Sequence, residues 1–324
     1  MKAQDFISEK LQELKQPLGL PKFSGQELEN EIVRLILSKK FRKYSMVEEE
    51  IAKIKNAVCV CVSENKPIEM VFSFGGYKLW RLSEAPEVDF AELFALMYFC
   101  KWLKPICEIY TPGIRLDCFS GDVFLPIINN IPESETRKYR KSFGRLITFL
   151  DRYKPHNLGI TFTRVFDQYN NEKEFLADFA ERKKELIASL GGKLPELSRE
   201  SRATVDLNVK TTPEQLEDVF WREKVMLDHD ALMAVSGCRP YVKRPNKVNF
   251  LVGCVPGSGR LTVGSTKNSI VKFWIGAGAL RPKGKGYEMT VLSPNQLEKI
   301  SFVFEPVALK GLTGKNFGEI RVIK

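Results

Sequence analysis

Hydrophobic positions follow a helical period over the first part of the chain. Apolar side chains spaced three and four positions apart, such as Ile32 and Ile36, predict amphipathic helices. These helices are expected over residues 4–15, 25–40 and 46–56. The apolar run 68–74 then reads as a buried strand that ends in a tight loop at Gly75 and Gly76.

Beyond this first strand, strand-like and helix-like segments alternate. Strands are predicted at 114–119 and 158–163, and helices at 90–103, 133–152 and 171–190. Asp89 stands where the cap of the first of these helices is expected. Strands joined by helices of this length predict βαβ units. The predicted fold class is therefore α/β, with a mostly parallel sheet covered by helices.

The pattern changes again near the C-terminus. A further helix is expected over 213–235, followed by short strands over 248–252, 260–264, 271–275, 287–292 and 317–323, with glycine-rich turns between them. We expect these strands to extend the main sheet or to form a small lobe beside it. The predicted organisation is a helical extension (1–56), an α/β core (57–238) and a β-rich part (239–324) packed on the same sheet.

The excess of positive charge is concentrated in residues 239–324. The whole chain of 324 residues carries a net charge of +10. Residues 239–324 hold 15 Lys and Arg against 4 Asp and Glu, a net of +11, so the remainder is close to neutral. We expect a basic face that could bind nucleic acid, with Tyr241, Phe273 or Trp274 available for stacking. Its predicted members are Lys243, Arg244, Lys247, Arg260, Lys267 and Lys272.

Cysteine and histidine usage limits the possible sites. The seven cysteines are an odd number without a C-x-x-C pair, which indicates free thiols in a reducing compartment. Two histidines exclude a multi-histidine metal site, and neither a metal nor a cofactor is expected, although a carboxylate site for a hard cation stays open as an alternative. No run of 18 apolar residues and no secretory signal is present, so the expected location is the cytoplasm, without membrane association.

The loop after the first strand is the most informative candidate site. Ligands of open α/β sheets bind beyond the carboxyl ends of strands, where glycine amides and basic side chains can hold an anion. The loop supplies these groups at Gly75, Gly76, Tyr77, Lys78 and Arg81. It reads equally well as a phosphate- or carboxylate-binding loop and as a surface turn with solvated charges.

Other polar residues stand on or just beyond the next two strands. Arg115, Asp117, Ser120 and Asp122 belong to one segment, and Arg164 and Asp167 follow another strand. A simple turn is the competing interpretation of Ser120 and Asp122. His229, between Asp228 and Asp230, is expected in a polar cluster on a helix surface.

One glycine pattern resembles a phosphate-binding loop without its context. Gly259, Gly264, Ser265 and Thr266 nearly spell that motif, but the lysine comes only at Lys267. A strand instead of a helix is expected after it, so we interpret this segment as a hairpin. No G-x-G-x-x-G motif opens a helix, which excludes a dinucleotide fingerprint.

Several of these segments together resemble the isocyanide (isonitrile) synthase family of pyoverdine and dityrosine biosynthesis. The segments that carry the resemblance are Phe72-Ser-Phe74, Leu82, Ala85-Pro86-Glu87, Asp89-Phe-Ala-Glu92, Ile109-Tyr110-Thr111-Pro112-Gly113 and Arg115-Leu-Asp-Cys-Phe-Ser120-Gly-Asp-Val-Phe124. Fainter likeness lies in 247–264 and 273–287. Two histidines of the family are replaced here, one in Val252-Gly-Cys254-Val255-Pro256 and one in Trp274-Ile275-Gly276, which is typical of a divergent member.

The resemblance implies a Rossmann-like enzyme that joins the α-amine of an aromatic amino acid to the sugar phosphate ribulose 5-phosphate. Its implied catalytic residues are Lys78, Asp89, Asp122 and Asp167: the three aspartates are candidates for proton transfer, and Lys78 belongs with the groups that hold the phosphate. It also implies substrate and phosphate binding by the residues Gly75, Gly76, Tyr77, Arg81, Arg115, Ser120 and Arg164. The alternatives are a protein that binds or modifies nucleic acid or nucleotides through the basic face, and a scaffold without catalysis.

Overall fold

Five parallel strands form the central sheet in the part of the chain that the structure describes. The computed structural model describes residues 1–39, 46–75, 78, 82, 87–193, 209–243, 248–252, 261–263 and 270–324. The strands are β1 (Ile68–Phe74), β2 (Ile114–Ser120), β3 (Leu158–Arg164), β4 (Val248–Val252) and β5 (Leu261–Val263). Their order in the sheet is β3-β2-β1-β4-β5, and every pairing is parallel. The predicted α/β fold with a mostly parallel sheet is confirmed.

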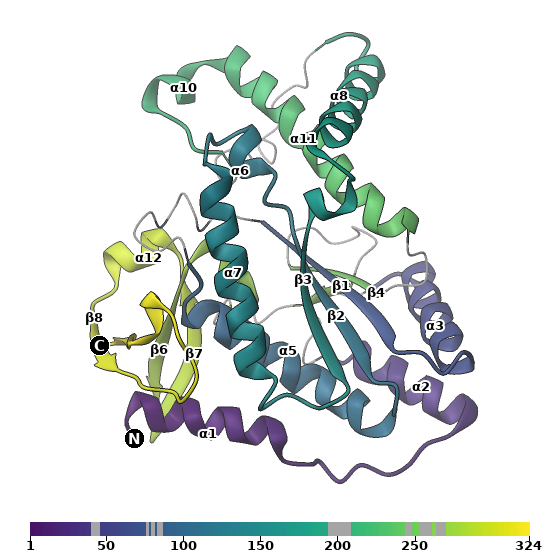
Figure 1. The fold of residues 1–324 in the computed structure, drawn as a ribbon, viewed down its shortest axis with the longest axis vertical. Coiled ribbons are helices and arrows are strands. Elements are labelled where there is room, and N and C mark those ends of the chain that lie inside the picture. Colours follow the sequence, from purple (N-terminus) through teal and green to yellow (C-terminus); the bar gives the residue numbers. More distant parts are fainter. Residues whose placement is uncertain are drawn as a thin grey trace.

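Helices cover both faces of this sheet (Figure 1). The side chains of Met70, Phe72 and Phe74 face a large core that includes α5 (Phe90–Ile109) and α7 (Glu133–Leu150). Val71 and Phe119 face the opposite side, where residues of α8 (Glu172–Ser189) and α11 (Val219–Lys243) pack. Alternate residues of a strand point to opposite faces, so near-continuous apolar strands are the expected consequence of two covered faces.

The N-terminal layer is helical, as expected. It consists of α1 (Ala3–Lys15), α2 (Gly25–Ile36) and α3 (Glu48–Ser63). Their buried apolar side chains join the core around α5. The helix α2 ends earlier than the expected residue 40, whereas α3 continues seven residues past the expected 56 because Ala57, Val58 and Cys61 are buried against the core.

The C-terminal part divides between two sheets. The strands β4 and β5 extend the central sheet, whereas the second sheet contains β6 (Ala277–Lys283), β7 (Gly286–Leu292), β8 (Phe302–Pro306) and β9 (Glu319–Ile323). Its order is β7-β6-β9-β8, with β6 and β9 parallel and the outer pairs antiparallel. Gly278 allows β6 to approach α5 closely, because a Cβ there would lie 2.4 Å from the backbone nitrogen of Ala91.

Two C-terminal predictions were wrong in detail. Residues 271–275 form the 3₁₀ segment η2 (Ile270–Ile275) instead of a strand. Tertiary packing overrides β-propensity here, because Phe273 is fully buried with its ring centroid 4.9 Å from that of Phe74. The single helix expected over 213–235 is two helices, α10 (Pro213–Glu217) and α11, which are separated at Asp218.

Short elements complete the described structure. They are α6 (Phe124–Ile127), η1 (Val165–Gln168), α12 (Pro294–Lys299) and η3 (Lys315–Phe317). In the residues that the structure describes, no helix is long and apolar enough to cross a membrane.

Candidate functional site

Three strands end side by side at the carboxyl edge of the central sheet. In the strand register, Phe74 of β1 lies beside Ser120 of β2, and Ser120 lies beside Arg164 of β3. The Gly121 amide donates a hydrogen bond of 2.7 Å to the carbonyl oxygen of Phe74, which joins the first two strand ends. The strand order reverses between β1 and β4, and open α/β sheets bind ligands beside such a reversal. This edge is therefore the candidate site.

One group of polar side chains at this edge centres on Arg164 and is called the Arg164 cluster. Its members are Arg164, Asp122, Glu133 and Thr136. The guanidinium donates to Asp122 Oδ2 at 2.5 Å and, in a bidentate pair, to the two carboxylate oxygens of Glu133 at 2.5 and 2.8 Å. Burial lowers the pKa of Arg164 and the two carboxylates raise it, with a net upward shift. Arg164 therefore stays positively charged and binds the carboxylates of Asp122 and Glu133.

Asp122 is the unusual member of the Arg164 cluster. The residue is 4% exposed, and its Oδ1 atom has no hydrogen-bond partner among the residues that the structure describes. Burial raises the pKa of Asp122 to about 6; Arg164 opposes this shift, and Glu133 and Asp167 add to it. A buried carboxyl with a pKa near neutrality and a vacant acceptor atom can take up or release a proton.

A second group, the Lys78 cluster, lies beside the start of α5 and consists of Lys78, Asp89, Glu92 and Tyr139. The Lys78 ammonium lies 2.9 Å from Asp89 Oδ1 and 2.8 Å from Glu92 Oε2. Tyr139 donates to Glu92 Oε1 at 3.0 Å. Asp89 and Glu92 also form the capping box of α5, so the same carboxylates begin the helix and bind the lysine.

The Lys78 cluster contains two buried carboxylates for one buried lysine. Burial raises the pKa of Glu92 to about 7, Lys78 lowers it, and Asp89 raises it further. Burial lowers the pKa of Lys78, but the two carboxylates shift it upward overall. One proton shared within this cluster near neutral pH would balance its charge.

Helix α7 connects the two clusters. Thr136 accepts a hydrogen bond of 3.3 Å from Arg164, and Tyr139 binds Glu92. These two residues lie three positions apart and therefore on neighbouring turns of one helix face. Figure 1 shows α7 between the central sheet and the C-terminal sheet. The clusters are thus adjacent parts of a single edge.

The structure brings some of the predicted site residues together and leaves others apart. Lys78 and Asp89 come together in one cluster, and Asp122 and Arg164 in the other. Asp167 accepts from the Arg164 amide and pairs with Arg140 at 3.0 Å. The remaining residues with described positions are Gly75 at the end of β1, Ser120 buried at the end of β2, and Arg115, exposed near the start of β2. Arg115 therefore lies away from this edge.

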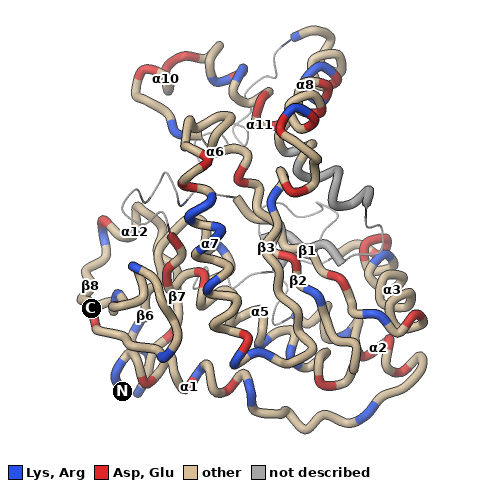
Figure 2. The backbone as a smooth tube through the Cα atoms, viewed as in Figure 1, with Lys and Arg blue, Asp and Glu red and all other residues tan. Residues whose placement is uncertain are grey.

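Some predictions fall on residues whose structure is not described. Gly76, Tyr77 and Arg81 of the loop lie outside the described residues, as do Arg244, Lys247, Arg260 and Lys267 of the basic face. Lys243 ends α11, with its side chain outside the description, and Lys272 is half-buried in η2. Acidic and basic positions are mixed along α8 in Figure 2. By the sequence, the charge excess of the whole chain lies in residues 239–324.

Sequence reasoning missed several residues of the two clusters. Glu133, Thr136 and Tyr139 carry no local motif, because only the packing of α7 brings them to the edge. Glu92 had a signal, the Asp-x-x-Glu spacing of a capping box at Asp89. The prediction for His229 was wrong: the residue is 3% exposed, and its ring centroid lies 5.1 Å from that of Phe124, just after Asp122.

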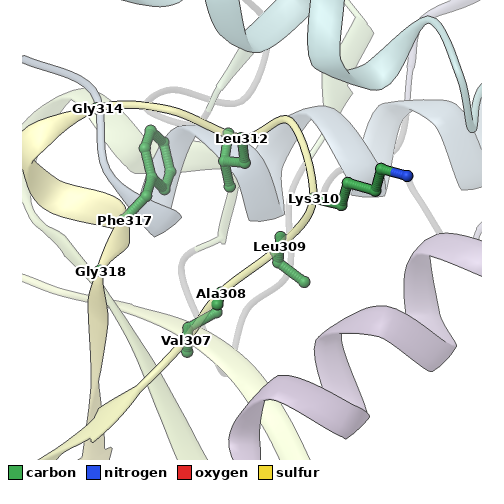
Figure 3. Close-up of a pocket in the computed structure, with 8 residues that line it drawn as sticks. All are labelled: Val307, Ala308, Leu309, Lys310, Leu312, Gly314, Phe317 and Gly318. Carbon is green, nitrogen blue, oxygen red and sulfur yellow. The ribbon is translucent and has the colours of Figure 1, made fainter.

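Two further properties of the described residues bear on ligand binding. No group of three or more His, Cys, Asp and Glu side chains among them could hold a metal ion. A hollow of about 330 Å³ lies in the segment before β9, and its lining is apolar or backbone except for Lys310, which extends away from the other side chains (Figure 3). This hollow offers little chemistry compared with the carboxyl edge.

Comparison with known proteins identifies the fold. No protein-family model and no curated protein matches the chain. The chain is similar in structure to the PvcA protein from Pseudomonas aeruginosa, with a TM-score of 0.61 and 13% sequence identity over 92% of this chain and 100% of that one. A CDPS from Fluoribacter dumoffii matches with a TM-score of 0.32 and 12% identity over 62% and 83% of the two chains, too low to carry an argument. The chain therefore shares the fold of PvcA.

Proposed function

We propose that the chain is a divergent isocyanide-synthase-like enzyme of the cytoplasm that joins an amine-bearing substrate to a phosphorylated, sugar-like substrate. The sequence resemblance and the fold shared with PvcA support this class of reaction. The observation that carries the proposal is the buried Asp122 carboxyl, whose Oδ1 atom is left without a partner at the carboxyl edge of the sheet.

The amine of the first substrate is assigned to Asp122. An ammonium group has only hydrogen-bond donors, and Oδ1 is an acceptor without a donor. Arg164 holds the other carboxylate oxygen, Oδ2, so the vacant atom is fixed in place. A buried polar atom without a partner costs free energy, and a bound ammonium would remove that cost.

Asp122 also suits the first chemical step. An amine attacks a carbonyl carbon only after its ammonium form has lost a proton. The raised pKa of Asp122, about 6, lets the carboxylate accept that proton near neutral pH. The neutral amine then adds to the sugar carbonyl, and loss of water leaves an imine.

Binding of the phosphate group is assigned to the loop that follows β1. Lys78 is bound by Asp89 and Glu92, so we assign it to holding the base of this loop in place of direct contact with phosphate. The Gly76 amide and the Arg81 guanidinium are left for the phosphate. Asp89 acts by capping α5 and holding Lys78.

Calorimetric titration tests both assignments. Asp122→Asn is expected to weaken binding of an aromatic amino acid, and Arg81→Ala is expected to weaken binding of ribulose 5-phosphate, each without affecting the other ligand. Asp151→Asn, at an exposed carboxylate, is the matched control and should bind both normally. Absence of binding of either ligand by the unaltered chain would refute the proposed function.

The charge of the C-terminal part supports a second candidate, binding of nucleic acid or a nucleotide through the basic face. If about five basic side chains neutralise phosphates of a single strand, the logarithm of affinity should fall against the logarithm of salt concentration with a slope near −3.5. Fluorescence anisotropy with a single-stranded oligonucleotide measures this slope. Binding that does not respond to salt would exclude this candidate.

A further inference from the structure

The strand β8 forms one edge of the C-terminal sheet and carries exposed apolar side chains. Val303 is 41% exposed and Phe304 is 48% exposed. Figure 1 shows β8 at the margin of the molecule, on the side away from the central sheet. Edge strands of this kind, without lysine or a bulge, are templates for pairing with another strand.

The backbone N–H and C=O groups of β8 point alternately toward β9 and toward this edge. Its odd-numbered residues bond inward to β9, as shown by the hydrogen bonds from Lys324 N to Ser301 O at 3.0 Å and from Val307 N to Gly318 O at 2.9 Å. In an antiparallel ladder the alternate residues point the other way. The N–H and C=O groups of Phe302 and Phe304 therefore face the edge where no other described strand pairs with β8, and Pro306 ends this set because it has no N–H.

Two aromatic side chains of β8 and one arginine of β9 lie together on one face of the C-terminal sheet. The Phe302 and Phe304 rings lie edge to face, with centroids 5.4 Å apart, and the Arg321 guanidinium lies over both at 5.7 and 5.3 Å. Arg321 fixes the two rings on the outer face of the sheet. Val303 points to the opposite face, as alternation along a strand requires.

We propose that a second copy of this chain occupies the edge, with the two β8 strands antiparallel about a two-fold axis at Val303. In this register Phe302 of each copy faces Phe304 of the other, and the outward backbone groups form four hydrogen bonds. The aromatic rings pair on one face. On the other face Ser301 of each copy lies opposite Glu305 of its partner, whose carboxylate accepts hydrogen bonds from the Ala3 amide and the Tyr287 hydroxyl of its own chain. The strand is thus complementary to itself.

One alternative register leaves the Phe302 carbonyl oxygen without a donor. A shift by two residues toward the C-terminus places Phe302 opposite Pro306, which cannot donate a hydrogen bond. Charge repulsion between the copies is small, because β8 and β9 together carry one basic residue, Arg321, and two acidic residues, Glu305 and Glu319. One strand pair buries a small area, so the dimer should be weak and depend on concentration.

Cross-linking tests the register directly. In a Cys59→Ser background, which removes the exposed thiol among the described cysteines, Val303→Cys should form an intermolecular disulfide under mild oxidation. Directly opposite residues at a position without backbone hydrogen bonds have Cα atoms about 4.5 Å apart, within the range of a disulfide. Phe304→Cys should cross-link far less, because the two Phe304 positions are offset along the strands. Val47→Cys, 57% exposed elsewhere, controls for random collision.

Sedimentation gives a second measurement on the unaltered chain. Dimer should appear as concentration rises, and Phe304→Lys should abolish it, since an edge lysine blocks strand pairing. A chain that stays monomeric up to sub-millimolar concentration, or one in which Phe304→Cys or Val47→Cys cross-links as readily as Val303→Cys, would overturn the proposal. A monomer that instead binds an extended apolar peptide at β8 would overturn the assignment to a second copy.

Discussion

The Lys78 cluster and the Arg164 cluster are built from the same kinds of groups but differ in how completely those groups are paired. Lys78, Asp89 and Glu92 are all buried and bind one another as well as the backbone amides of Asp89 and Ala91. The Arg164 cluster leaves one oxygen of Asp122 without a partner, and the side chain of Glu133 is 33% exposed. We call the Lys78 cluster closed because its charged groups are paired with one another and with the backbone. We call the Arg164 cluster open because one carboxylate oxygen of Asp122 has no partner among the described residues.

This difference separates a structural role from a chemical one. A buried charge network with every group satisfied fixes the positions of chain segments, here the start of α5 and the residue Lys78 that follows β1. A buried network that lacks a partner for one acceptor is completed by something else, and a substrate amine fits that acceptor. We therefore expect substitutions in the first cluster to act on stability and substitutions in the second to act on binding.

The largest expected effect is on stability, from Lys78→Met. Without the ammonium, Asp89 and Glu92 are buried without a cation, which costs about 3–5 kcal/mol of unfolding free energy. Urea unfolding measures this cost. Lys66→Met, which breaks an exposed pair with Glu64, is the control and should cost far less, because exposed ion pairs contribute little to stability. An equal cost for both variants would contradict the structural role of Lys78.

The next effect is on function, from Asp122→Asn. Loss of a proton-transfer group should lower turnover of the amine substrate by about 10²–10⁴-fold. The unfolding free energy should change by only about 1 kcal/mol, because the amide keeps one oxygen as an acceptor for Arg164. A steady-state assay and a urea titration on the same samples separate the two effects. Unchanged turnover with reduced stability would reverse the roles assigned to the two clusters.

A smaller effect concerns the pH dependence of stability. The folded chain keeps a proton on Glu92 up to a pKa of about 7, whereas an unfolded glutamic acid releases it near 4.5. The folded state therefore binds more protons in this interval, so stability falls as pH rises through it and levels off above. Glu92→Gln should reduce this slope in urea midpoints measured from about pH 5 to about pH 8. A free energy of unfolding that rises over this range by the same amount in the wild-type and Glu92→Gln proteins would contradict the raised pKa of Glu92.

The smallest effect is expected from Tyr139→Phe. Removing the hydroxyl deletes one hydrogen bond to Glu92, worth about 0.5–1.5 kcal/mol, and leaves the aromatic packing in place. Amino-acid binding should be unchanged, since Tyr139 belongs to the closed cluster. Calorimetry on this variant checks that separation, and a loss of binding would show that the two clusters act together through α7.

The sequence predicted the sheet and its edge better than the site. Apolar runs gave β1, β2 and β3 within one residue, and their parallel arrangement placed Asp122 and Arg164 at one edge. Pairing partners were not predictable, because Glu133 and Tyr139 lie on a helix whose rotation depends on tertiary packing. The strand predicted over 271–275 is a 3₁₀ segment because tertiary packing decides the local conformation there too: Phe273 packs in the core beside Phe74.

The most direct test of the account is a crystal structure of the chain with a bound aromatic amino acid. We predict that the ammonium nitrogen lies within hydrogen-bond distance of Asp122 Oδ1, while Arg164 keeps its bonds to Oδ2 and Glu133. A ligand bound elsewhere, with Oδ1 still without a partner, would contradict the assignment of the Arg164 cluster as the site of chemistry.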